Sequence, residues 1–200
     1  MAEQSMVELL SILKTRSWLE QDQEFTLASG RRSRYYIDSK MTTLIPEGAR
    51  LVGEAVYAAL QDDNIEAVGG LAHAAIPMVT AVVMASSTKA RPIPGFYVRE
   101  EAKEHGTQKI IEGFRLEPGT RVAIIDDVLT TGGSILKAIE RAQDSGAIVV
   151  KVIVLVDRRE GGAENLRNKG YDITALFEKF ETAEGGGLRI TEPALALIHN

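Results

Sequence analysis

The segment with the clearest chemical potential joins two carboxylates to hydroxyl-bearing residues and a pair of glycines. It consists of Asp126, Asp127, Val128, Leu129, Thr130, Thr131, Gly132, Gly133 and Ser134. Glycines let the backbone approach a ligand and adopt positive φ, and the free N–H groups at a helix start favour a phosphate. The hydroxyls add donors, so this segment predicts a turn that binds a phosphate group.

The two acids, Asp126 and Asp127, would repel a phosphate unless a cation or hydroxyl donors lay between them. A magnesium ion, or ribose hydroxyls that donate to the carboxylates, would resolve this conflict. A ribose 5-phosphate with a magnesium-bound diphosphate combines these groups. The simpler alternative, in which the acids only cap a helix, leaves the hydroxyls and glycines behind them unexplained.

Other phosphate-binding motifs do not occur in the sequence. It contains neither the G-x-x-x-x-G-K-[ST] motif of nucleoside triphosphatases nor the G-x-G-x-x-G motif of dinucleotide sites. A receiver domain also uses paired acids, but near the start of the chain and with a separate Asp and Lys later. A sugar phosphate is therefore the favoured ligand.

The elements that must position this segment alternate between strands and helices from residue 46 onward. Strands are expected at 35–38, 67–70, 92–98, 121–126, 148–156 and 171–177. Helices are expected at 5–19, 46–61, 77–84, 134–144, 163–169 and 194–198, and a mobile loop at 99–113. This alternation predicts an α/β fold with a parallel sheet, in which ligands bind beyond the carboxyl ends of the strands.

The composition limits the class of protein. The chain has 200 residues, is 44% hydrophobic and carries a formal net charge of -5 with a pI of about 5.3. This is enough apolar material for one core, so we expect a single domain over 1–200 with a small N-terminal element. The acidic balance argues against a nucleic-acid partner.

The sequence contains no cysteine, which excludes disulfides, thiolate catalysis and cysteine-based zinc sites. The N-terminus lacks the basic region and apolar block of a signal peptide. No apolar run approaches the roughly 20 residues that span a bilayer. We expect a soluble, cytoplasmic protein with no membrane partner.

Residues 122–134 resemble the phosphoribosyl-diphosphate (PRPP) binding motif of the type I phosphoribosyltransferases. The resemblance implies their fold, a central and mostly parallel sheet flanked by helices, with a base-contacting hood at about residues 1–40. It implies that Asp126 and Asp127 bind the ribose hydroxyls and that Thr130–Ser134 hold the 5-phosphate. Magnesium is the implied cofactor, bound mainly to the diphosphate near the two acids rather than to a site made of side chains alone.

Four further segments resemble the orotate phosphoribosyltransferase family in their order and spacing. They are residues 25–38, 69–77, 97–106 and 157–162. The whole resemblance covers about residues 20–165. It implies an enzyme that transfers ribose 5-phosphate from PRPP to orotate, giving orotidine 5′-phosphate and diphosphate for pyrimidine biosynthesis.

The resemblance also assigns roles to single residues. The residues implied to contact orotate are Ala28, Tyr36, Ile37, Thr130 and Arg158. Those implied to contact PRPP are Arg99, Lys103, His105 and the whole of segment 126–134, Val128 and Leu129 included. Lys103 and His105 would act in catalysis beside the two acids.

Arg158 suits the orotate carboxylate because its guanidinium can donate two parallel hydrogen bonds. Taken alone, it would be interpreted as a surface arginine paired with Asp157 or Glu160. The charged loop 99–113 would close over the reacting groups and exclude water. In the family this loop reaches the site of a neighbouring subunit, which implies a homodimer.

Two positions depart from the family pattern. Glu100 stands where a lysine is usual, and residues 99–109 hold three Lys or Arg against three Glu. Ala74 stands where a glycine is usual in the loop expected to bind diphosphate. Two alternatives therefore stay open, a type I transferase for another base and a catalytically weak, ligand-sensing regulator.

Overall fold

The computed structural model describes residues 2–26, 32–61, 64–101, 110–182 and 185–199. Its strands are β1 (Trp18–Thr26), β2 (Arg32–Ile37), β3 (Ala67–Leu71), β4 (Gly95–Val98), β5 (Ile111–Gly113), β6 (Arg121–Leu129), β7 (Ile148–Asp157), β8 (Ile173–Thr182) and β9 (Gly185–Ile190). Its helices are α1 (Ala2–Ile12), α2 (Lys40–Thr43), α3 (Pro46–Ala59), α4 (Ala75–Ser86), α5 (Gly133–Asp144), α6 (Gly162–Asn168) and α7 (Glu192–His199).

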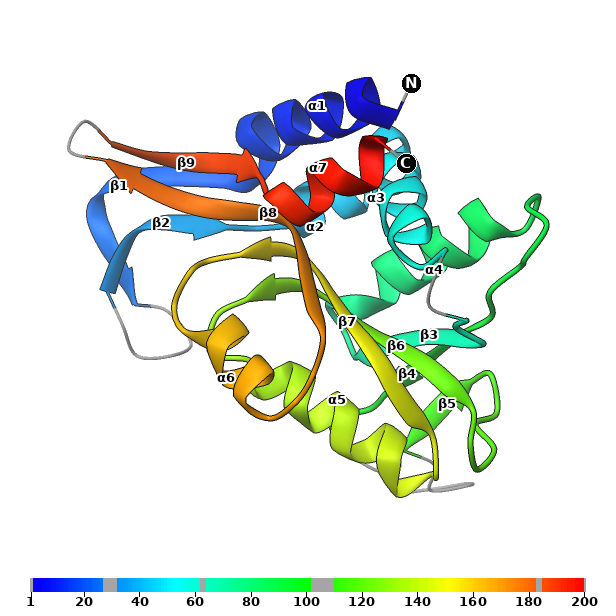
Figure 1. Cartoon of the computed structure of the whole chain (residues 1–200). Coiled ribbons are helices and arrows are strands. Elements are labelled where there is room, and N and C mark those ends of the chain that lie inside the picture. Colours follow the sequence, from blue (N-terminus) through cyan, green and yellow to red (C-terminus); the bar gives the residue numbers. More distant parts are fainter. Residues whose placement is uncertain (1, 27–31, 62–63, 102–109, 183–184, 200) are drawn as a thin grey trace.

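The strands form a large sheet in the order β5-β4-β3-β6-β7-β8-β9 and a separate hairpin sheet, β1-β2 (Figure 1). Neighbours from β4 through β8 are parallel, whereas the edge strands β5 and β9 are antiparallel to β4 and β8. The predicted α/β fold with a central, mostly parallel sheet is therefore confirmed.

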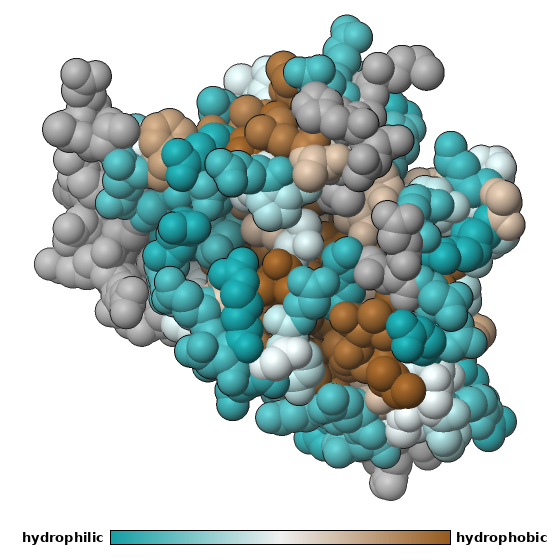
Figure 2. Space-filling model, in the orientation of Figure 1, coloured by the Kyte–Doolittle hydropathy of each residue, from teal (hydrophilic) through white to brown (hydrophobic). Residues whose placement is uncertain are grey.

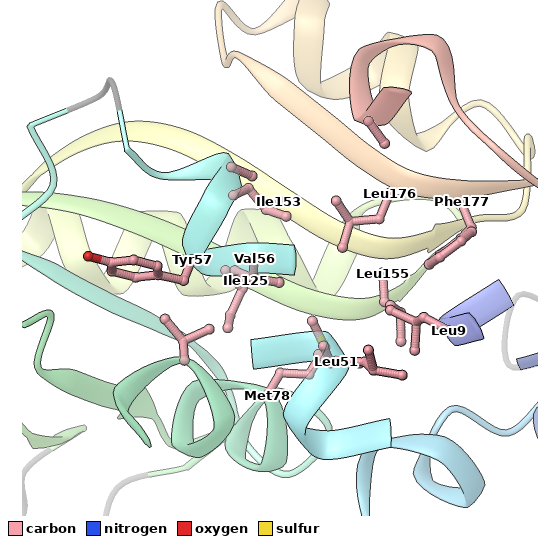
Figure 3. Packing of buried hydrophobic residues seen from close by; sticks show 14 of the residues in the cluster. Leu9, Leu51, Val56, Tyr57, Met78, Ile125, Ile153, Leu155, Leu176 and Phe177 are labelled. Carbon is pink, nitrogen blue, oxygen red and sulfur yellow. The ribbon is translucent and has the colours of Figure 1, made fainter. Parts of the chain in front are cut away.

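Helices cover both faces of the large sheet, and each face has its own hydrophobic core. On one face, residues such as Leu51, Met78 and Ile125 join α1, α3, α4 and α7 to the strands (Figure 3). On the other face, Ile135 of α5 and Leu166 of α6 pack against the sheet. Because both faces are covered, the central strands are continuous apolar runs rather than alternating ones.

The outer surface is predominantly polar. The face seen in Figure 2 carries mostly hydrophilic side chains, with hydrophobic ones gathered in a few patches. In the part of the chain that the structure describes, no helix combines the length and apolarity needed to cross a membrane.

The N-terminal helix is shorter than predicted. Instead of running to residue 19, α1 ends at Ile12, a π-helical segment follows over Leu13–Ser17, and Trp18 begins β1. The Trp18 ring lies 4.9 Å from the ring of Tyr35, and Trp18 pairs with Ile37 across the hairpin. These contacts with β2 override the helical spacing of the preceding apolar residues.

The prediction of a loop throughout 99–113 was wrong at its end. Ile111–Gly113 form β5, which pairs antiparallel with β4, while 102–109 lie outside the described residues. Gly113 pairs with Phe96 at a φ of +94°. The strand is short and contains a glutamate and a glycine, so its own sequence carried little strand signal.

Four other elements differ from the prediction. The last predicted strand, 171–177, is β8 and extends to Thr182, and neither β9 nor the short helix α2 was predicted. The glycines that begin β9 have weak intrinsic strand preference, so only pairing with β8 makes them a strand. Strand β6 continues to Leu129 instead of ending at Asp126, which places Asp127 within the strand as well.

Candidate active site

Four hydrogen bonds fix the two acids at the carboxyl end of β6. The Ser134 hydroxyl donates to Oδ2 of Asp126 at 2.7 Å, and the Ser39 hydroxyl donates to Oδ2 of Asp127. The N–H of Val128 donates to Oδ1 of Asp127 at 2.7 Å, and the N–H of Asp127 donates to Oδ1 of Asp126 at 3.1 Å. The carboxylates are therefore held by hydroxyl and amide donors, as a site for ribose hydroxyls requires.

Asp126 is almost fully buried, with 4% of its surface exposed. Burial raises the pKa of Asp126 to about 7, and the neighbouring charge of Asp127 adds to the rise. The hydrogen bond from Ser134 opposes the shift. A cation or a set of hydroxyl donors beside Asp126 would favour its charged form, so the pair suits a sugar–metal ligand electrostatically.

The turn at residues 130–132 follows the two acids and leads into the start of α5. Gly132 has a φ of +86° as the N-cap residue, and its carbonyl accepts a hydrogen bond from the N–H of Leu136 at 3.0 Å. A Cβ placed on Gly133 would meet no atom within 4 Å, so open space lies before the helix. Thr131 and Ser134 are exposed there. The arrangement can hold a phosphate by hydroxyls and free backbone N–H groups.

Helix α6, which follows β7, supports this turn from behind. A Cβ on Gly162 would lie 2.4 Å from the carbonyl oxygen of Thr130, so only a glycine permits this packing. The Asn165 amide donates to the carbonyl of Thr131 at 3.2 Å. Leu129 is buried in the core with Leu166, so only its backbone is available to a ligand.

Arg158 lies at the carboxyl end of β7 and is buried, at 4% exposure. Its Nε lies 2.8 Å from Oε1 of Glu160, and its Nη2 donates to the carbonyl of Tyr35 at 3.2 Å. The pairing with Glu160 that its sequence allowed is therefore present, but Arg158 is not a surface residue. Asp157 instead accepts a hydrogen bond from the N–H of Arg159 at 2.7 Å, and burial raises the pKa of Asp157.

The two tyrosines of strand β2, Tyr35 and Tyr36, lie in different surroundings. The Tyr35 ring packs on Trp18, whereas Tyr36 is 38% exposed. Ile37 belongs to the main core at 6% exposure, so its side chain cannot face a ligand and only its backbone could contact a base. Tyr36 is the better placed of the predicted base contacts on this strand.

The segment expected to bind diphosphate follows β3, the strand beside β6. A Cβ on Gly70 would lie 2.2 Å from the carbonyl oxygen of Ile125 and 2.5 Å from Cβ of Ala75. Close packing of this kind brings the start of α4 next to the acid-bearing strand. Ala74 is the N-cap residue of α4, and the peptide bond between Ala72 and His73 is cis.

The structure describes only part of the predicted lid. Arg99 is half-buried, its N–H donates to the carbonyl of Ile110 at 2.8 Å, and its Nε lies 3.4 Å from the carbonyl of Glu101. Lys103, His105 and Ala28 lie outside the described residues, and their predicted roles remain predictions.

The sequence did not point to Ser39 as a site residue, although its hydroxyl contacts Asp127. Ser39 and Lys40 are polar residues directly after the predicted strand 35–38, and they were the available signal. Nothing local indicated that Ser39 would reach an acid 88 positions away.

Within the described residues, no group of three or more His, Cys, Asp or Glu side chains could hold a metal ion by itself. Asp126 and Asp127 nevertheless supply hard oxygen donors that fit magnesium. Magnesium commonly binds through one or two carboxylates together with substrate phosphates. The donor set is therefore suited to a metal that arrives with a diphosphate.

A parallel sheet that ends in paired acids and a phosphate-binding turn defines an α/β protein built for a phosphorylated sugar. The model of the phosphoribosyl transferase domain matches residues 41–177. The chain belongs to this family and, by its relatives, to the orotate phosphoribosyltransferases.

Similar sequences support this assignment over nearly their full length. The orotate phosphoribosyltransferase of Sorangium cellulosum is 45% identical over 170 residues, covering 84% of this chain and 88% of the relative. That of Aquifex aeolicus is 42% identical over 175 residues, covering 87% and 95%.

A solved structure of Mycobacterium tuberculosis orotate phosphoribosyltransferase in complex with PRPP is also similar. It is 34% identical, has a TM-score of 0.71 and covers 86% of this chain and 94% of that one. An adenine phosphoribosyltransferase of Leishmania tarentolae has a TM-score of 0.63 at 18% identity, covering 89% of each chain, and shares the fold alone.

Proposed function

We propose that this protein transfers ribose 5-phosphate from PRPP to N1 of orotate, giving orotidine 5′-phosphate and diphosphate in pyrimidine biosynthesis. The observation that carries the proposal is the hydrogen-bonded pair Asp126–Asp127 immediately before the open turn of α5. The similarity to orotate phosphoribosyltransferases supports orotate as the base.

The chain's residues act mainly by position. Asp126 and Asp127 accept hydrogen bonds from the ribose hydroxyls, and Thr130–Ser134 bind the 5-phosphate. As the bond from C1 to the diphosphate oxygen breaks, positive charge grows on the sugar, and the two carboxylates lie where they stabilise it. N1 of orotate, having lost its proton, forms the new bond to C1.

The base and the leaving diphosphate need separate partners. Arg158 would bind the orotate carboxylate beneath β2, near Tyr36. Arg99, Lys103 and His105 would meet the diphosphate when the loop closes. Magnesium, held by diphosphate oxygens near Asp126 and Asp127, would supply positive charge to the leaving group.

A base-by-base assay tests the proposal. With PRPP and magnesium we expect orotate to be consumed, followed by its ultraviolet absorbance, and adenine, hypoxanthine and uracil to be left unchanged. Efficient turnover of another base would favour the paralogue alternative. Binding of RNA or DNA without turnover of any base would favour the regulator, against which the net charge of -5 argues.

We further propose that the protein forms a homodimer. Loop 99–113 can reach a neighbouring site only if a second subunit is present. A groove of about 680 Å³ between α2, α3 and α4 supports it. Leu44 and Met84 line this groove at 66% and 67% exposure, which is costly for apolar side chains in water. A second copy of the chain would cover them.

A cytoplasmic location is proposed on the absence of cysteine and on the reaction. A cysteine-free chain is compatible with a reducing compartment, and the proposed reaction belongs to pyrimidine biosynthesis. Fractionation of cells that express the protein, with activity followed in each fraction, tests this location.

A further inference from the structure

We propose that Ser39 is a positioning residue of the sugar site, which fixes Asp127 through its hydroxyl and ties the acid to the base-contacting strand β2. This inference rests on the proposed function. It concerns a residue in the segment between the hairpin and α3, far in sequence from the PRPP motif.

The first support is the direction of the Ser39 side chain. Ser39 is the N-cap residue of α2, where a serine hydroxyl normally caps its own helix by accepting a hydrogen bond from a backbone N–H. No such side-chain bond is made here. The hydroxyl instead donates to Asp127, although the residue is buried at 1% exposure. The start of α2 is capped instead by Asp38, whose carboxylate accepts a hydrogen bond from the N–H of Lys40 at 3.2 Å, which leaves the Ser39 hydroxyl available to contact the acid.

The second support is the charge of the donor. Lys40, the next residue, forms its ion pair with Asp38 at 2.9 Å, although the charge of Asp127 also helps to raise the pKa of Lys40. The hydrogen bond that Asp127 accepts from this segment comes from the neutral hydroxyl of Ser39. A neutral donor orients the carboxylate and leaves its charge available to a ribose or a magnesium ion.

The third support is the geometry of the Asp127 carboxylate. Ser39 donates to Oδ2 and the N–H of Val128 donates to Oδ1, so both oxygens are oriented by one donor each. Each carboxylate oxygen can accept a further hydrogen bond. The acid is thus oriented before the sugar arrives, which lowers the ordering cost of binding.

The fourth support is continuity with the hairpin. Ser39 follows β2 by two positions, and the N–H of Asp38 donates to the carbonyl of Ser17 at 2.9 Å at the root of the hairpin. Arg158 contacts the same strand through the carbonyl of Tyr35. The segment 35–39 therefore joins the predicted base site to the sugar site.

The test compares Ser39→Ala with Ser17→Ala, a matched loss of a buried hydroxyl. Ser17 is fully buried, and its hydroxyl lies 2.6 Å from that of Thr42 in α2 rather than contacting an acid of the site. Binding of magnesium–PRPP without orotate is measured by calorimetry, together with KM, kcat and Tm. Without orotate, no transfer complicates the binding measurement.

We expect Ser39→Ala to weaken PRPP binding and to raise the KM for PRPP about tenfold, with kcat changed less than threefold. Ser17→Ala should lower Tm at least as much as Ser39→Ala does, but its affinity for PRPP should stay within twofold of the wild-type value. Ser39→Thr, which keeps the hydroxyl, should recover most of the affinity.

Equal PRPP affinity in Ser39→Ala and Ser17→Ala would overturn the inference. So would a Ser39→Thr variant that folds but binds as weakly as Ser39→Ala. Failure of the wild-type protein to bind PRPP would instead contradict the proposed function. If Ser39→Ala does not fold, the comparison of Ser39→Thr with Ser39→Cys decides, since a thiol is a weaker donor and should bind PRPP more weakly.

Discussion

At the scale of single residues, the site depends on Asp126, an acid whose charged form is destabilised by burial. Asp126 is buried beside a second carboxylate, and its pKa is raised to about 7 from 3.8. A buried acid that serves only the fold would normally have a cationic partner. Among the described residues, Asp126 accepts hydrogen bonds from the Ser134 hydroxyl and the Asp127 amide, both neutral donors, so a ligand could supply the positive partner.

The raised pKa gives Asp126→Asn a testable pH signature. Between about pH 4 and 7 the folded state binds more protons than the unfolded state, so stability falls as the pH rises through this window. Without ligand, Asp126→Asn should therefore raise Tm relative to the wild type at pH 8 and have little effect near pH 4. Calorimetric scans at both values check this.

Asp172→Asn provides the control, because Asp172 is an exposed aspartate. It should change Tm little at either pH. The Asp126→Asn protein should also lose at least a hundredfold in kcat/KM, since its amide cannot replace a charge beside the cationic sugar. An equal Tm at pH 8 in wild type and Asp126→Asn would contradict the conclusion that the buried charge of Asp126 destabilises the folded state.

Glu100 sits where the family pattern has a lysine, and it is exposed. We expect Glu100→Lys to raise kcat/KM severalfold at low salt, because a cation in the lid would attract the diphosphate. The gain should shrink at high ionic strength as salt screens the charge. Steady-state rates at two salt concentrations measure both effects.

Glu101→Lys makes the same charge change one residue further on. A gain confined to Glu100→Lys indicates a contact specific to that position, whereas equal gains indicate long-range attraction alone. No gain in either variant would mean that the lid does not depend on these charges.

At the scale of elements, the site is formed where three neighbouring strands end. Strand β6 supplies the acids, β3 leads into the start of α4, and β7 leads into Arg158 and then into α6, which supports the phosphate turn. The ends of parallel strands meet at one edge of the sheet, so segments far apart in sequence converge there. The hairpin β1-β2 then approaches this edge through Ser39 and Tyr35.

The Gly133→Ala variant distinguishes an effect on stability from an effect on phosphate binding. A methyl group there meets no protein atom within 4 Å, so Tm should stay within about two degrees. The same methyl would enter the space expected to hold the 5-phosphate, so PRPP affinity should fall at least tenfold. Calorimetric binding and thermal melting of one sample measure both quantities.

Gly70→Ala is the contrasting variant. Its methyl would collide with the carbonyl of Ile125 and with Ala75, both parts of the packed interior. We expect a clear loss of Tm together with activity. If Gly133→Ala binds PRPP like the wild type, the phosphate does not occupy the space before α5.

At the scale of the whole molecule, one surface groove is the place where we propose that a second copy of the chain binds. The groove between α2, α3 and α4 is lined mainly by apolar side chains, and Arg50 and Glu54 form an ion pair at 3.0 Å at its side. A second copy packed against this groove would bury its exposed apolar area.

Met84→Glu and Leu44→Glu should therefore yield monomers. We expect the mass from light scattering to halve and the activity to fall more than tenfold, because the lid would lose its neighbouring site. Ile148→Glu, at a position that is 49% exposed but does not line the groove, should keep the wild-type mass. A wild-type protein that is monomeric at assay concentrations would contradict the dimer.

The sequence by itself determined the sheet class and the central motif. The acids, hydroxyls and glycines of 126–134 are consecutive, so one strand and one helix start suffice to bring them together. Long apolar runs marked the central strands because helices cover both of their faces. The predicted strand at 121–126 and the helix at 134–144 were therefore close to β6 and α5.

Only the tertiary structure decided which distant residues complete the site. Ser39 reaches Asp127 across 88 positions, and Arg158 reaches Tyr35 across 123, distances over which no local pattern acts. The edge strands β5 and β9 likewise exist through pairing with β4 and β8 rather than through their own composition. Backbone pairing and burial form only when the sheet is assembled, so these features follow from the whole fold.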